Sequence, residues 1–207
     1  MPVPTAACSP EPAAAAGPAG DWRDWHWPDE AACAATAAAL ARQPALRDAT
    51  VELHGPLGAG KTTFVRHLLR ALGVAGRIKS PTYTVVETYL ATCADGPADG
   101  PADGPADGPA DQPGGRPGGR PDGSGDFTVV HLDFYRFTDA RELLDAGLRD
   151  LFAAPGLKLV EWPSRAAGLL PAADLSLNIE PEADDGRRVH AVAFTPRGQE
   201  LLAQCSR

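Results

Sequence analysis

The sequence predicts an α/β fold with three layers, in which helices cover both faces of a mixed central sheet. A glycine-rich motif at residues 55–62 lies between a strand-like run and a helix-like run. Strand-like and helix-like patterns mix along the rest of the chain, which is typical of α/β proteins. The strand-like runs at 84–90 and 127–132 follow each other without a helix pattern between them. A direct hairpin is therefore expected, and the sheet is predicted to be mixed rather than wholly parallel.

The glycine-rich motif has the sequence of a phosphate-binding P-loop. Residues 55–62 read Gly-Pro-Leu-Gly-Ala-Gly-Lys-Thr and match G-x-x-x-x-G-K-[ST]. Glycine permits the turn dihedrals that let backbone N–H groups converge on phosphate oxygens, and the following helix directs its positive end at the anion. Lys61 is expected to reach the β- and γ-phosphates, and the Thr62 hydroxyl to bind magnesium. A chance match in such a chain is on the order of one per cent, so the motif predicts a P-loop NTPase fold.

The segments around the motif follow the order that a phosphate site requires. Asp29 is a predicted N-cap for an alanine-rich helix through Ala41. A strand is expected at 51–54, directly before the loop. After the loop, apolar residues recur at helical spacing over 62–72, and Gly73 is a candidate C-cap.

The later part of the chain predicts further strands and three more helices. Alternating or continuous apolar runs predict strands, at residues 84–90, 127–133, 157–162, 175–179 and 189–194. Asp139 and Glu142 have the spacing of a capping box for a helix that ends near Asp145. Helices are also expected at 148–153 and 197–204.

Two stretches are predicted to be disordered, while residues 21–207 form a single domain. Residues 1–20 are rich in Ala and Pro and are expected to be a tail. Residues 91–126 interrupt the domain with an Ala-Asp-Gly-Pro array that lacks aromatic residues and aliphatic side chains larger than alanine. Such a segment cannot bury enough apolar surface to offset the entropy of ordering. Its position predicts an insertion at a hairpin tip, where extra loop length costs little.

Most of the net charge of −8 lies outside the predicted domain. Seven Asp and two Arg in residues 91–126 contribute −5, and Glu11 contributes −1, which leaves −2 for the remainder. Direct capture of nucleic acid usually requires a basic surface, so composition does not predict it.

The cysteines and the apolar runs indicate a cytoplasmic protein. The four cysteines are scattered and form no C-x-x-C pair, so reduced thiols are expected rather than a zinc site or disulfides. No apolar run approaches the length of a membrane span. The N-terminus lacks the positive start and apolar block of a signal peptide.

A P-loop requires a further acidic residue near its magnesium. Asp133 and Glu161 each end an apolar strand-like run, where α/β folds place their ligands. The hydroxyl-rich segment 79–84, Lys-Ser-Pro-Thr-Tyr-Thr, is equally consistent with a loop that senses the γ-phosphate and with a Ser-Pro turn before a strand.

Four blocks in order carry a family resemblance: 58–64 (Gly-Ala-Gly-Lys-Thr-Thr-Phe), 79–84, 131–136 (His-Leu-Asp-Phe-Tyr-Arg) and 159–162 (Leu-Val-Glu-Trp). Together they resemble the bacterial TsaE (YjeE) family, the ATPase of tRNA threonylcarbamoyladenosine synthesis, over roughly residues 26–195. The resemblance implies a mixed-sheet P-loop ATPase that binds ATP and Mg²⁺ and has low activity without partners. Its implied partners are TsaB and TsaD, which transfer a threonylcarbamoyl group to adenosine 37 of tRNAs that read codons beginning with A. Contact with tRNA would be indirect, through that complex.

Carried over by position, the resemblance also implies roles for individual residues. Thr62 and Glu161 would hold magnesium, and Asp133 occupies the family's other acidic position near the phosphates. Lys61, Asp133 and Glu161 are the implied catalytic residues, and which carboxylate orients the attacking water stays open. The implied nucleotide-binding residues are Glu30, Leu57, Gly58, Ala59, Gly60, Lys61, Thr62, Thr63 and Gly186.

Two departures from the family pattern and three alternatives remain. The family usually has an acidic residue where this chain has Pro56, which removes one N–H from the loop. The insertion at 91–126 replaces what is normally a short connection.

A GTPase would require an N-K-x-D motif, which the chain lacks. A small-molecule P-loop kinase would require an Arg-rich lid, and none is evident. An ATP-gated binding module without significant hydrolysis stays open.

Overall fold

The structure, a computed structural model, describes residues 21–82, 84–92, 125–137 and 147–204. The predicted tail, most of the predicted insertion and the helix predicted from Asp139 lie outside these residues. The strands are β1 (Trp22–Trp27), β2 (Thr50–His54), β3 (Val86–Ala91), β4 (Phe127–Asp133), β5 (Leu157–Glu161), β6 (Leu175–Pro181) and β7 (Arg187–Ala193). The helices are α1 (Glu30–Ala41), α2 (Lys61–Ala71), α4 (Leu148–Ala153) and α5 (Pro196–Gln204), with 3₁₀ helices η1 (Pro44–Asp48) and η2 (Pro163–Ala166).

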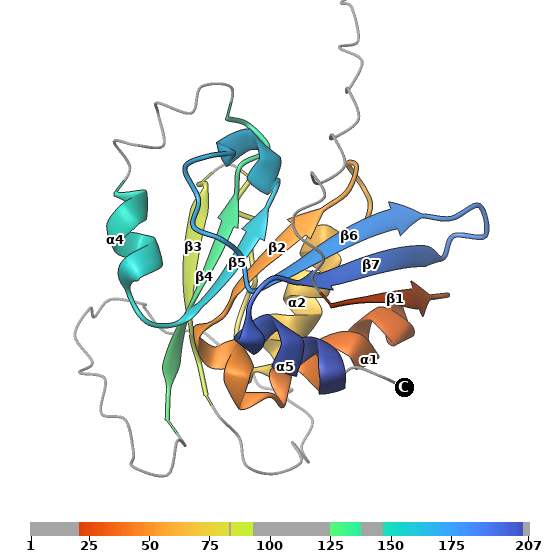
Figure 1. The fold of residues 1–207 in the computed structure, drawn as a ribbon, viewed down its shortest axis with the longest axis horizontal. Coiled ribbons are helices and arrows are strands. Elements are labelled where there is room, and N and C mark those ends of the chain that lie inside the picture. The colour runs from red at the N-terminus through yellow and green to blue at the C-terminus, as the bar shows by residue number, and fades with distance from the viewer. Residues whose placement is uncertain (1–20, 83, 93–124, 138–146, 205–207) are drawn as a thin grey trace, which may run out of the picture.

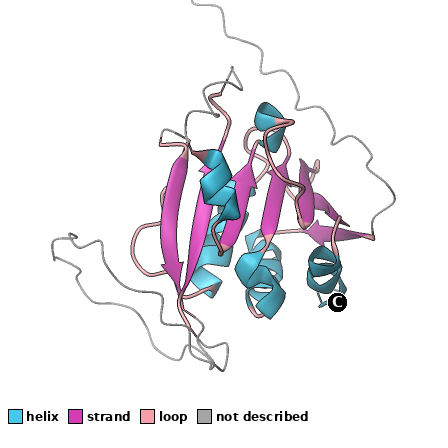
Figure 2. Cartoon of the chain, turned by 60° about the vertical axis from the view of Figure 1, so that its left-hand side comes forward, coloured by secondary structure: helices cyan, strands magenta, loops and turns pink. Residues whose placement is uncertain are grey.

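The described strands form one seven-stranded sheet in the order β1-β7-β6-β2-β5-β4-β3 (Figure 1). β2 runs parallel to both β5 and β6, and β4 runs parallel to β5. The outer pairs β1–β7, β6–β7 and β3–β4 are antiparallel. The strands stand side by side in one layer with helices against it (Figure 2). The sheet is therefore mixed, as the predicted hairpin required.

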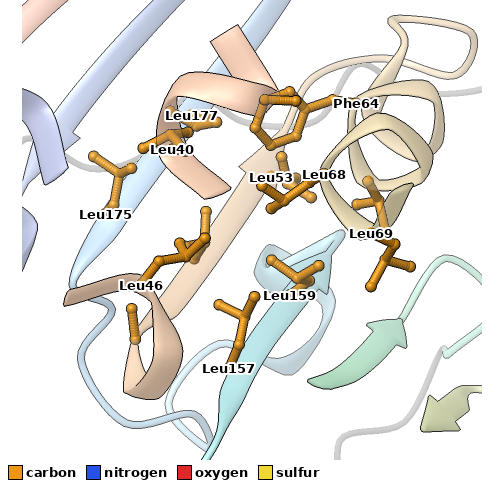
Figure 3. Close-up of a cluster of buried hydrophobic side chains, with 14 of the residues drawn as sticks. Leu40, Leu46, Leu53, Phe64, Leu68, Leu69, Leu157, Leu159, Leu175 and Leu177 are labelled. Carbon is orange, nitrogen blue, oxygen red and sulfur yellow. The ribbon is translucent and has the colours of Figure 1, made fainter. Parts of the chain in front are cut away.

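Two buried clusters lie on opposite faces of the sheet, because side chains alternate in direction along each strand. In β5, Leu157 and Leu159 belong to a cluster that includes residues of α1, α2 and α5. Val160, the residue after Leu159, belongs to a second cluster with Leu148 of α4. Figure 3 shows Leu159 between Leu157 and Leu53, with helices over this face. Helices on both faces of one sheet give the three predicted layers.

The sequence signals for the first two helices are confirmed. The Asp29 side chain accepts a hydrogen bond of 2.8 Å from Ala32 N, which caps α1 at its predicted start. In α2 the apolar side chains recur at helical spacing and are buried; they are Phe64, Val65, Leu68 and Leu69. Gly73 follows α2 with a φ of 77°, as a glycine that ends a helix does.

Backbone torsion explains where two strands differ from their predicted ranges. Val85 has a φ of 70°, and its N–H donates to Pro81 O, so β3 begins at Val86 rather than at residue 84. Trp162 has a φ of 57° and turns the chain directly after Glu161, so β5 ends at that carboxylate. The strand β1 and the two 3₁₀ helices were not predicted.

The strands β3 and β4 form the predicted hairpin. Ala91, the last residue of β3, is the register partner of Phe127, the first residue of β4. Thr92 N donates a hydrogen bond of 3.2 Å to Leu72 O, which joins this end of the hairpin to the end of α2. The low-complexity segment therefore connects two strand ends that are already paired.

Candidate functional site

The P-loop connects β2 to α2 in the predicted strand–loop–helix order. Gly55, Gly58 and Gly60 have φ values of 130°, 79° and 108°, a region that residues with a Cβ rarely adopt. Ala59 N donates to Pro56 O at 3.2 Å, and Phe64 N donates to Gly60 O at 2.9 Å, where α2 begins. The backbone therefore curves around the first turn of α2, as phosphate binding requires.

Lys61 is buried, and its ammonium group is directed back to the loop. Its Nζ donates to the carbonyl oxygens of Gly55 at 2.6 Å and Pro56 at 2.9 Å. The same atom lies 3.9 Å from the centroid of the Trp162 ring, a cation–π contact. Pro56 lacks an N–H, but its carbonyl helps to hold the lysine inside the loop.

Thr62 and Glu161 meet at the start of α2, although 99 positions separate them in the sequence. The Thr62 hydroxyl lies 2.9 Å from each oxygen of the Glu161 carboxylate and donates to it. Glu161 is 2 % exposed, and its Oε1 is also 2.9 Å from His131 Nε2. Hydroxyl and carboxylate oxygens are the ligand type that magnesium prefers.

Asp133 lies beside Glu161, because the two residues are register partners at the ends of β4 and β5. Its carboxylate accepts hydrogen bonds from Thr82 Oγ1 at 2.6 Å and from Tyr135 N at 2.9 Å. Ser80 Oγ lies 2.8 Å from Thr82 Oγ1 and extends this chain of polar contacts. Burial raises the pKa of Asp133, and the bonds from Thr82 and Tyr135 oppose that shift. The hydroxyl-rich segment therefore contacts the site through Thr82.

A cavity of about 230 Å³ opens beside the P-loop on the side of α1. Its lining residues come from three parts of the chain; they are Trp27, Asp29, Glu30 and Cys33, then Ala59, Gly60 and Thr63, then Asp185 and Arg187. Glu30 also pairs with His67 of α2 at 2.9 Å. Burial raises the pKa of Cys33 to about 12, so its thiol stays protonated at neutral pH.

The turn between β6 and β7 lines one side of this cavity with Asp185 and Arg187. Arg187 Nε donates to Ala59 O at 2.8 Å, and its Nη1 donates to the carbonyls of Asp185 and Gly186 at 2.6 and 2.8 Å. Gly186 lies against β1, since a Cβ on it would be 3.3 Å from Trp27 O. The predicted residue Gly186 therefore sits next to the cavity, and its neighbours line it.

The structure brings the predicted residues into two adjoining groups. Lys61, Thr62, Asp133 and Glu161 surround the start of α2, and Glu30 and Thr63 line the neighbouring cavity. Two of the predicted residues are exposed: Leu57, on the loop, is 65 % exposed, and the Glu30 side chain is 73 % exposed at the rim of the cavity.

Three residues at the site were assigned no role from the sequence: His131, Trp162 and Arg187. His131 precedes Asp133 by two positions in a strand, so period-2 alternation already placed both on one face. Trp162 and Arg187 directly follow Glu161 and Gly186, but their contacts with Lys61 and Ala59 depend on the folded chain.

The described residues carry no larger metal cluster and no membrane span. In these segments no three His, Cys, Asp or Glu side chains gather as a metal-binding group. Among the described helices, none has the length and apolar content that a membrane crossing requires.

Comparison with known proteins relates the chain to one family. The family model for threonylcarbamoyl adenosine biosynthesis protein TsaE matches residues 27–96 and 121–189. The tRNA threonylcarbamoyladenosine biosynthesis protein TsaE of Haemophilus influenzae is 33 % identical over 156 residues, which cover 75 % of this chain and 77 % of that protein. The protein of the same name from Bacillus subtilis is 29 % identical over 155 residues, 75 % of this chain and 76 % of that one.

A solved structure supports the fold. The crystal structure of Bacillus subtilis YdiB matches with a TM-score of 0.62 and 22 % sequence identity. The match covers 91 % of this chain and 97 % of that chain, so the two share the three-layer α/β architecture.

Proposed function

The chain belongs to the TsaE family of threonylcarbamoyl adenosine biosynthesis proteins, and we propose that it is the magnesium-dependent ATPase of this biosynthesis. Membership of the family makes it a protein of tRNA threonylcarbamoyladenosine biosynthesis. The proposal adds ATP hydrolysis, the cytoplasm as its location and TsaB and TsaD as its partners. The modified position would be adenosine 37 of tRNAs that read codons beginning with A, reached only through the partner complex.

The observation that carries the ATPase proposal is the Thr62–Glu161 pair at the P-loop. Both oxygens of a buried carboxylate lie 2.9 Å from the hydroxyl that a P-loop offers to magnesium. Magnesium is usually held by one or two carboxylates together with substrate phosphates, and the site supplies one carboxylate and a hydroxyl. The residues present therefore fit a magnesium–nucleotide complex.

The cradle and the cavity fit the rest of a nucleotide. Positive φ values at Gly58 and Gly60 are typical of a glycine-rich phosphate loop, and a Cβ on Gly58 would meet only open space. The adjoining cavity of about 230 Å³ is lined by Ala59 and Gly60 of the loop itself and by Thr63 of α2. We assign it to the nucleoside, with Glu30 and Arg187 as its charged lining.

The mechanism depends on positioning and on neutralising charge. Magnesium, when bound, offsets the negative charge of the phosphates. Lys61 leaves the carbonyls of Gly55 and Pro56 and donates to phosphate oxygens, and the loop N–H groups stabilise charge that develops on the transferring group. Asp133 or Glu161 orients the attacking water. Asp133 is the stronger candidate, because burial raises its pKa, and a more basic carboxylate accepts a proton from water more readily.

Phosphate release from ATP tests this proposal, with and without TsaB and TsaD and with and without Mg²⁺. We expect slow release by the chain alone, faster release with the partners and a loss of about 10³-fold or more in Lys61→Ala, whose ammonium group carries transition-state charge. Full turnover in Lys61→Ala would contradict the assignment of the P-loop.

Two other outcomes favour the alternatives. ATP binding without release under any condition favours the ATP-gated binding module. Loss of ATP that transfers phosphate to a small molecule, rather than releasing it, favours a P-loop kinase.

A further inference from the structure

His131 is the most deeply buried polar side chain around the candidate metal site. It lies in β4, two residues before Asp133, so it shares the α2 face of the sheet with both carboxylates. Its side chain has no solvent exposure. Neither the P-loop motif nor the proposed mechanism gives it a role.

Among the described residues, the imidazole ring makes one polar contact, and that contact is to the metal-binding candidate Glu161. Its Nε2 lies 2.9 Å from Glu161 Oε1. Its Nδ1 is buried and has no hydrogen-bond partner among the described residues. The proton is therefore assigned to Nε2, since the other tautomer would bury an unpaired N–H donor and place a ring lone pair against a carboxylate.

An apolar side chain of similar size would fill this position without burying an unpaired polar atom. The hydrogen bond to Glu161 thus offsets the cost of burying a histidine in the core.

The hydrogen bond from His131 to Glu161 also differs from the one that Thr62 makes. The Thr62 hydroxyl donates to both oxygens of Glu161, and a hydroxyl that ligates a metal must offer its oxygen lone pair there instead.

We propose that His131 is a positioning residue that holds the Glu161 carboxylate for the divalent cation of the bound nucleotide. Its Nε2–H fixes Oε1 from the sheet side, and this contact does not compete with a cation between Glu161 and Thr62. Outer hydrogen bonds of this kind commonly set metal affinity, because they orient the ligating carboxylate. The inference rests on the proposed function, since it assumes that Thr62 and Glu161 bind the metal of a nucleotide.

The test measures ADP binding to the full-length chain, once in EDTA and once at increasing Mn²⁺, with bound Mn²⁺ followed by electron paramagnetic resonance. His131→Leu fills the core but lacks the donor. His131→Gln places an amide N–H near the position of Nε2, whereas the shorter His131→Asn does not reach Glu161. Glu161→Ala defines complete loss of the carboxylate, and His190→Gln, at an exposed His–Asp24 pair on the outer strands, is the matched control.

We expect His131→Leu and His131→Asn to weaken Mn²⁺ binding in the ADP complex by about 10–100-fold. Affinity for ADP in EDTA should stay at the wild-type value, which a misfolded variant would not show. His131→Gln should recover most of the Mn²⁺ affinity. If His131→Leu fails to unfold cooperatively, the contrast between the Gln and Asn variants carries the test.

Two results would overturn the inference, and they are distinguishable. Wild-type Mn²⁺ affinity in both His131→Leu and His131→Asn removes the positioning role and leaves the proposed function intact. Absence of Mn²⁺-dependent ADP binding in the wild-type chain overturns the proposed function and the inference together.

Discussion

At the scale of single residues, two buried carboxylates dominate the electrostatics of the site. Asp133 and Glu161 are 3 % and 2 % exposed and stand side by side in register. Each has its own donors: Thr82 and the Tyr135 N–H bond Asp133, whereas Thr62 and His131 bond Glu161. A charged carboxylate survives burial only where such donors replace water. The polar neighbours therefore supply the hydrogen bonds that burial takes away from the two carboxylates.

The pKa of Asp133 leads to a prediction about stability. Burial is the largest cause of the raised pKa, and Glu161 raises it further, while the bonds from Thr82 and Tyr135 and the nearby His131 lower it. A carboxyl group with a folded-state pKa above its unfolded value stabilises the fold fully below the unfolded pKa. That stabilisation is lost as the pH rises through the folded pKa.

Asp133→Asn does not titrate, so its stability relative to wild type should increase from about pH 4 upward and then level off. Urea unfolding of both proteins across this range, without metal or nucleotide, measures the difference. A difference that is constant with pH, or that decreases, would contradict the raised pKa. If Asp133 orients the water, the same variant should lose about 10²–10⁴-fold in phosphate release.

At the scale of elements, the P-loop depends on the strand next to it. Gly55 directly follows β2 and lies against β6. A Cβ on Gly55 would be only 2.2 Å from Ile179 O. We expect Gly55→Ala to lower the free energy of unfolding by about 2–5 kcal/mol, from the left-handed backbone together with the steric clash.

Gly58→Ala is the matched control for this substitution. Gly58 also has a positive φ, but a Cβ there meets nothing within 4 Å. Its cost should be about 1–2 kcal/mol, the backbone term alone. If urea unfolding finds the same loss of stability for both variants, the steric clash with β6 does not contribute to the effect of Gly55→Ala.

A second link between elements joins the β6–β7 turn to the same loop. Arg187 Nε bonds the Ala59 carbonyl across 128 positions of sequence. This bond has a charged donor, so it contributes more free energy than a neutral hydrogen bond, and it holds the loop that is proposed to bind the phosphates. Arg187→Ala should therefore weaken ADP binding about tenfold. The neighbouring Arg188 is exposed and pairs with Glu182 at 2.7 Å instead. Calorimetric titration should therefore find Arg188→Ala close to wild type, and equal losses would refute a specific role for Arg187.

At the scale of the whole molecule, the low-complexity segment joins strands that the rest of the sheet already holds. β4 pairs with β5 on one side and β3 on the other, so the hairpin does not depend on a long connection. Replacing residues 94–123 by a short Asn-Gly turn should preserve phosphate release and ADP affinity.

The shorter loop should also raise the free energy of unfolding by up to about 2 kcal/mol, because closing a shorter loop costs less conformational entropy. Urea unfolding and phosphate-release assays on the shortened chain measure both effects. A loss of stimulation by TsaB and TsaD, with ADP affinity unchanged, would instead assign the segment to partner binding.

Local patterns in the sequence predicted much of this fold. The N-cap at Asp29, the amphipathic spacing in α2 and the glycines of the P-loop involve residues a few positions apart, and the structure confirms each. β1 was missed because it is an edge strand whose residues are mostly exposed, so its apolar pattern is weak. It is defined by pairing with β7, which no local pattern reports.

The sequence by itself determined the chemistry that the site can carry: a P-loop, a Thr62 hydroxyl at the start of a helix and two carboxylates at strand ends. Only the tertiary structure decided how these groups meet. The order β2-β5-β4 places Glu161 at Thr62 and Asp133 beside Glu161, and the β6–β7 turn brings Arg187 to Ala59. The physical reason is that strand order follows from packing two apolar faces of the sheet against helices, a property of the whole chain.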